Sequence, residues 1–98
     1  MSFMDFEFEG PVIEWRGPRP FYFVRVPEEE SGDIKFAAQG VEYWGQVPVL
    51  VRIADIEFRT ALFPKDGRYL IPLKDAVRKS AGIDSDQVVA VGLNVRRD

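Results

Sequence analysis

The chain has 98 residues, which suffices for one domain (residues 1–98) built around a single modest hydrophobic core. Hydrophobic residues make up 46% of the sequence, a content that excludes an intrinsically disordered chain. The formal net charge is −3, and the absence of histidine and cysteine excludes Ser-His and Cys-His catalytic pairs, histidine or thiolate metal sites and disulfide bonds.

No apolar run approaches the length of about 20 residues that a membrane helix needs. The N-terminal segment carries Asp5 and Glu7, where a secretory signal peptide would carry positive charge. We therefore expect a soluble, cytoplasmic protein.

The first half of the chain carries three strand signals. Residues 4–9 alternate between hydrophobic and acidic side chains, which is the period of a strand with one buried face and an acidic outer face. Aromatic and β-branched residues dominate 21–26, and valine and isoleucine occupy every second position of 47–53. Both of these segments resemble the inner strands of a sheet.

The second half carries three more strand signals. A tight reversal at 53–56 predicts a hairpin into the alternating segment 56–62, and the sequence Pro-Lys-Asp-Gly at 64–67 is typical of a turn. Further strands are expected at 69–71 and at 87–95. The sequence thus predicts a mainly β fold, a small barrel-like sheet of six mostly antiparallel strands with one or two short helices.

One pattern occurs twice: a β-rich run that ends near a proline, a short helical stretch, a glycine, and another β-rich run. The first copy contains Pro27 and Gly40, and the second contains Pro72 and Gly82. Proline ends a strand and fits the first turn of a helix, and glycine adopts the left-handed conformation at which helices commonly reverse. We therefore expect two strand-Pro-helix-Gly-strand units.

The two helical stretches differ in their signals. The hydrophobic residues of 73–81 recur at helical spacing after Pro72, with charged residues on the other side, which predicts a helix with one buried face. In the first copy, the acidic residues 28–30 suit a helix N-terminus, but Ser31 and Gly32 are expected to interrupt the helix.

The order of several short motifs points to a known family. The hairpin, Gly-Arg-Tyr, Leu-Ile-Pro-Leu, Ala-Val-Arg-Lys and Gly-Ile follow one another after VPVLVRI, with FYFVRVP ahead of them. Over nearly its whole length the chain resembles the small bacterial barrel proteins catalogued as domain of unknown function nineteen-zero-five. The resemblance implies a double-split β-barrel, the architecture of the AbrB-like transcription regulators and antitoxins, and it implies no particular activity.

Charged clusters have two interpretations each. The acidic residues 28–30 and Asp33 could hold a hard cation, but they lack the spacing and glycine of a calcium loop and fit a solvated helix start better. Lys74, Arg78 and Lys79 share one helix surface, with Arg68 just ahead, and such a patch could meet phosphate. The net charge argues against a nucleic-acid-binding domain and for a solvated helix face. On such a face Arg78 could form a salt bridge with Asp75 or with the acidic residues of the first copy of the repeat.

Aromatic residues that are expected to be partly exposed offer another candidate site. Trp15, Tyr43, Trp44 and Tyr69 fall at or near strand ends and loops, where rings either plug the end of a small barrel or line a ligand site. The eight phenylalanines are expected to lie mostly in the core.

These observations favour a single-domain, non-enzymatic binding or interaction module without a metal or other cofactor. Its partner would be a small molecule, a peptide or a protein, held by aromatic stacking and arginine hydrogen bonds, and the internal repeat favours a monomer. The candidate ligand-binding residues are Trp15, Tyr43, Trp44, Arg52, Arg59, Arg78 and Lys79. The alternative is an AbrB-like regulator or antitoxin-type protein that binds DNA as a dimer, and an enzyme based on a carboxylate is a third hypothesis.

Overall fold

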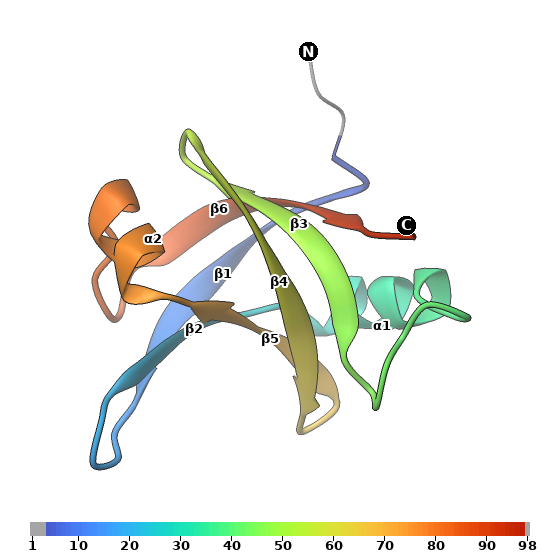
Figure 1. Cartoon of the computed structure of the whole chain (residues 1–98), viewed down its shortest axis with the longest axis horizontal. Helices are drawn as coiled ribbons and strands as arrows, with labels where there is room; N and C mark the ends of the chain where they lie inside the picture. The colour runs from blue at the N-terminus through green and yellow to red at the C-terminus, as the bar shows by residue number, and fades with distance from the viewer. Residues whose placement is uncertain (1–3, 98) are drawn as a thin grey trace.

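The computed structural model describes residues 4–97, in which six strands close into one barrel with two short helices (Figure 1). This confirms the mainly β, six-stranded barrel that the sequence predicts. All neighbouring strands are antiparallel, in the cyclic order β1-β2-β5-β4-β3-β6. The elements are β1 (Phe6–Trp15), β2 (Phe21–Arg25), α1 (Glu28–Ala37), β3 (Val47–Ile53), β4 (Ile56–Lys65), β5 (Arg68–Leu73), α2 (Asp75–Ala81) and β6 (Val88–Val95).

The two longest strands form the corners of the barrel. Strand β1 pairs with β6 through residues 6–11 and with β2 through residues 12–15. Strand β4 pairs with β3 through residues 56–62 and with β5 through residues 63–65. At the first corner, the backbone of Gly10 lies so close to β2 that an added Cβ would sit 2.4 Å from the carbonyl oxygen of Arg25.

The strand order reflects the sequence repeat. Exchanging β1 with β4, β2 with β5 and β3 with β6 leaves every pair of neighbours in the barrel unchanged. In both halves a helix connects the second strand to the third, and the two helices lie on opposite sides of the barrel (Figure 1). The repeat unit is therefore larger than the sequence indicates, since each half begins with a long strand that the motif does not include.

The core receives inward-facing residues from all six strands and from α1. Fully buried members are Val12, Val24, Val49, Leu62, Ile71 and Leu93 from the strands and Ile34 from the helix. The alternation of buried and exposed residues is clearest in β3, as its sequence predicts.

Helix α1 is continuous through Ser31 and Gly32, so the expected interruption is wrong. Ser31 is buried, its hydroxyl donates to the carbonyl oxygen of Val26 at 3.3 Å, and it accepts a hydrogen bond from the backbone N–H of Tyr69 at 3.2 Å. These contacts, together with the burial of Ile34, outweigh the low helix propensity of the pair.

Helix α2 begins later than its motif predicts. Pro72 lies within β5, and the helix starts only at Asp75 after the N-cap residue Lys74. None of its residues is fully buried, although Val77 packs against the core. Gly82 ends the helix in the left-handed conformation, with φ of 66°, as predicted.

The Ser31 contacts give a first prediction. Replacing Ser31 with alanine should lower the free energy of unfolding by about 1–3 kcal/mol, because the buried N–H of Tyr69 loses its acceptor. Urea denaturation measures the change. The matched control is Ser80→Ala at an exposed position of α2, which should change stability by less than about 0.5 kcal/mol. Equal effects of the two substitutions would contradict the contribution assigned to Ser31.

The phenylalanines are not all in the core. Phe21 and Phe36 are 58% and 75% exposed, which corrects the expectation, whereas Phe8 and Phe23 are buried. Phe3 lies outside the described residues. Phe23 is buried on the outer side of the barrel, where it takes part in the surface described next.

Candidate functional site

The structure separates the candidate ligand-binding residues into five places. Tyr43 and Trp44 stay together, with ring centroids 6.2 Å apart, at a tight turn. Trp44 and Gly45 are the two central residues of this turn, and hydrogen bonds between Tyr43 and Gln46 close it. Their rings are 71% and 86% exposed and therefore do not plug the barrel. Trp44 has a φ of 55°, a conformation that is rare for a bulky residue, and it is followed by Gly45 at 78° as in a type I′ turn.

Arg52 and Arg59 project from the outer side of β3 and β4. Arg52 pairs with Glu57 at 3.1 Å, directly across the two strands. Arg59 lies opposite Leu50 and lines a shallow surface together with Arg97, whose guanidinium donates to the carbonyl oxygen of Ala37. Each of these arginines belongs to a different local set of contacts, and neither lies beside an aromatic candidate.

Arg78 lies on α2, and neighbouring side chains contact its guanidinium. Its guanidinium stacks on the ring of Tyr22 at 4.0 Å from the centroid and lies 4.0 Å from the carboxylate of Asp75. Only 21% of its side chain is exposed, whereas Lys79 is exposed on the same helix. Of the two pairings considered for Arg78, the structure shows the one with Asp75.

Trp15 belongs to an outer surface of the barrel that the sequence did not predict. Strand register places Trp15 opposite Phe21 and Ile13 opposite Phe23, so all four side chains project from one face. Phe23 meets Trp15 edge-on with centroids 6.1 Å apart and meets Phe63 of β4 at 5.3 Å. An aromatic ladder thus crosses the outside of the barrel from β1 to β4.

Cations surround this ladder. The ammonium of Lys65 lies 4.1 Å from the centroid of the Trp15 ring, a cation–π contact. Arg25 projects from β2 opposite Leu70, and Arg68 projects from β5 opposite Lys65. Arg68 pairs with Glu28 at 3.5 Å, while Arg25 has no salt-bridge partner among residues 4–97.

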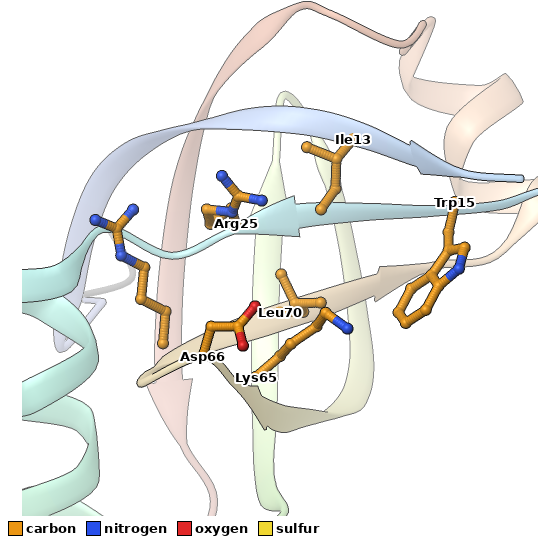
Figure 2. Close-up of a pocket in the computed structure, with 7 residues that line it drawn as sticks. Ile13, Trp15, Arg25, Lys65, Asp66 and Leu70 are labelled. Carbon is orange, nitrogen blue, oxygen red and sulfur yellow. The ribbon is translucent and has the colours of Figure 1, made fainter.

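Two hollows flank the ladder. The first has a volume of about 340 Å³, and side chains from β1, β2 and the β4–β5 hairpin border it (Figure 2). It is lined by Ile13, Trp15, Arg25, Lys65, Asp66, Arg68 and Leu70. The second hollow, of about 470 Å³, is lined by Arg19, Pro20, Phe21, Tyr22, Phe23, Pro72, Leu73, Lys74 and Asp75. We call the outward surface formed by the ladder and both hollows the aromatic–basic face.

The charge of the aromatic–basic face opposes that of the whole chain. Five cations and two carboxylates line the two hollows, although the chain carries a net charge of −3. Buried apolar residues form the floor, since Leu70 is 2% and Phe23 is 9% exposed, and the half-exposed ring of Trp15 forms one wall. Such a surface can bind an anionic group and a flat apolar group side by side.

Other chemistry is less well supported among the described residues. No group of three or more Asp or Glu side chains in residues 4–97 is arranged to hold a metal ion. None of the helices in that range is long and apolar enough to cross a membrane. Tyr69 is buried, and its burial together with the carboxylate of Glu42 raises the pKa of its phenol above the ordinary value.

Sequence reasoning found Trp15 and placed Arg68 only with the cations of the second helix, and it missed Phe21, Arg25 and Lys65. One signal was available: in the segment FYFV, residues 21–24, the positions on both faces are hydrophobic or aromatic, although the outer face of a small barrel is usually polar. The partner strands that complete the face lie about 50 residues further along the chain, and local periodicity does not identify them.

Comparison with models of known protein families identifies the family of this chain. Residues 8–93 match the model of a family described as a domain of unknown function, DUF1905. No curated protein matches the chain.

Proposed function

This chain belongs to the DUF1905 family of domains of unknown function, and we propose that it is a non-enzymatic binding module whose ligand combines an anionic group with a flat apolar group. The ligand occupies the aromatic–basic face. The observation that carries this proposal is the gathering of five cations around an aromatic ladder in a chain of net charge −3.

The cations are arranged to receive an anion beside Trp15. Lys65 already lies over the indole ring, and Arg25 lines the same hollow without a competing salt bridge in residues 4–97. Arginine offers paired donors to carboxylate, sulfate or phosphate oxygens, and these charge-assisted bonds are stronger than neutral ones. The anionic group would therefore contact Arg25 and Lys65.

The apolar part of the ligand would lie on the exposed rings. Trp15 is 47% and Phe21 is 58% exposed, and both rings are supported from the barrel side by neighbouring strands. A planar group that stacks on either ring buries apolar area without requiring the barrel to rearrange, because the ladder is already packed.

The alternative of an AbrB-like duplex-DNA binder has less support. It relied on the α2 cations, but Arg78 is engaged by Tyr22 and Asp75. The remaining cations of that group, Lys74 and Lys79, are single exposed lysines at the ends of a seven-residue helix.

The proposal is tested by an amide NMR titration with 2-naphthalenesulfonate, a flat apolar anion. We expect shifts centred on Trp15, Arg25, Lys65 and Arg68, and a three- to tenfold loss of affinity on Arg25→Ala, since the position contributes one charge-assisted contact in a partly exposed site.

Two comparisons decide the outcome. Arg59→Ala removes an exposed arginine from a different outer surface and should leave the affinity unchanged. The uncharged analogue 2-naphthalenemethanol should bind more weakly than the sulfonate. Equal binding of the two compounds, or shifts spread away from the aromatic–basic face, would overturn the proposal.

A further inference from the structure

We infer that the ligand of the aromatic–basic face is a single-stranded nucleic acid, an inference that rests on the proposed function and names its substrate class. Single-strand binders combine a cationic surface that follows the sugar-phosphate backbone with aromatic rings on which successive bases stack. Both features are present on the outside of β1, β2, β5 and β4.

The two exposed rings are placed as neighbours. Trp15 and Phe21 are direct cross-strand partners beside the loop of the β1–β2 hairpin, so their side chains emerge next to each other on the same face. Both are about half exposed, at 47% and 58%. Two adjacent stacking surfaces of this kind suit two consecutive bases of one strand.

The cations extend to both sides of these rings. Arg25, Lys65 and Arg68 lie around the first hollow, and Arg19 and Lys74 lie around the second. A strand whose bases stack on Trp15 and Phe21 can therefore place phosphates in both directions along the face. A single small anion would use only one of the two hollows.

The geometry favours an unpaired strand over a duplex. In a duplex the base faces are stacked on one another, so flat rings on an open surface reach them only in single-stranded segments. The aromatic–basic face is the outside of a sheet, with hollows of about 340 and 470 Å³. Helix α2, which begins beside the second hollow, has seven residues.

An acidic peptide could pair with the cations of the face but would not stack on both exposed rings. Its carboxylates could pair with Arg25 and Lys65, yet it offers no planar group to each exposed ring in turn. The combination of charge and stacking therefore favours nucleic acid, and acidic peptide binding is an outcome that the experiment separates.

The experiment compares two fluorescein-labelled probes of equal charge by anisotropy: an octamer of deoxythymidine and an octamer of abasic sites. We expect the thymidine octamer to bind at least tenfold more tightly, because each stacked base adds affinity that the abasic strand lacks. If three to five phosphates are contacted, the affinity should fall with salt at a logarithmic slope of about −2 to −3.5.

Matched variants locate the binding surface. Trp15→Ala and Phe21→Ala should each weaken thymidine-octamer binding about fivefold or more, and Trp15→Phe should retain most of the affinity because a ring remains. Trp44→Ala removes a more exposed tryptophan from a separate turn and should have no effect. Amide spectra of all variants verify that the barrel remains folded.

Each outcome is informative. Equal binding of thymidine and abasic octamers, or tighter binding of a glutamate octapeptide or of duplex DNA, would overturn the inference. If 2-naphthalenesulfonate binds at the face while the thymidine octamer does not, the inference is wrong and the proposed function stands. If neither probe shifts amides of the face, both are wrong.

Discussion

Replacing Leu62 with alanine is expected to lower the free energy of unfolding by about 2–5 kcal/mol, which is the usual cost of truncating a fully buried leucine. Leu62 is completely buried and is the last residue of β4 that pairs with β3 before the strand turns to β5. The substitution leaves a cavity at a corner of the barrel, where strands from both halves meet. A domain of this size has only about 5–15 kcal/mol of stability in total.

Urea denaturation followed by tryptophan fluorescence measures this effect. Leu50→Ala provides the matched control, since Leu50 lies on the neighbouring strand with its side chain partly exposed on the outer surface. The control should cost clearly less than the core substitution. Similar losses for the two leucines would contradict the inward assignment of Leu62.

Replacing Gly10 with alanine is expected to destabilise the barrel by about 1–3 kcal/mol, the range typical of overpacking. The added Cβ would lie 2.4 Å from the carbonyl oxygen of Arg25 and 3.0 Å from a methyl carbon of Val24. Because the closest atom belongs to the backbone, relief requires β1 and β2 to separate. Faster amide hydrogen exchange in β2 should accompany the loss of stability.

The same substitution in α1 should have the opposite effect. A Cβ on Gly32 meets nothing within 4 Å, and alanine favours the helix by about 0.5–1 kcal/mol over glycine. Gly32→Ala is therefore expected to stabilise the protein. If both substitutions shift the unfolding midpoint in the same direction, close packing at Gly10 is not the dominant effect.

The sequence predicted the existence of all six strands because their signals are local, but it did not extend the first strand to residue 15 or the fourth to residue 65. Alternation of buried and exposed positions is a property of a single strand, as in residues 47–53, and turn chemistry such as Asp66-Gly67 depends on a few adjacent residues. Gly82 was assigned correctly for the same reason. These features need no knowledge of which strands are neighbours.

The predictions from the sequence were wrong where the local structure depends on contacts with residues distant in the chain. Ser31 and Gly32 have low helix propensity, yet α1 continues through them because Ser31 bonds to Val26 and Tyr69. Pro72 resembled a helix start, but pairing of β5 with β2 keeps it in a strand, opposite Phe23. In both cases long-range contacts override a local preference.

The candidate site shows the same division. Composition limited the chemistry by excluding histidine and cysteine, and the sequence correctly singled out Trp15 as a ring outside the ordinary core pattern. It also named Arg52, Arg59 and Arg78 as candidates. In the structure these three arginines lie apart, and each makes its own local contacts.

The sequence by itself therefore determined the number and order of the strands, the buried face of those that alternate regularly, and the presence of an internal repeat. Only the tertiary structure decided that Trp15 meets Lys65, 50 positions away, and that Arg25 and Arg68 line the same hollow. The physical reason is that periodicity along one strand states which side chains share a face but not which strand lies beside it. The barrel order β1-β2-β5-β4-β3-β6 supplies that second piece of information.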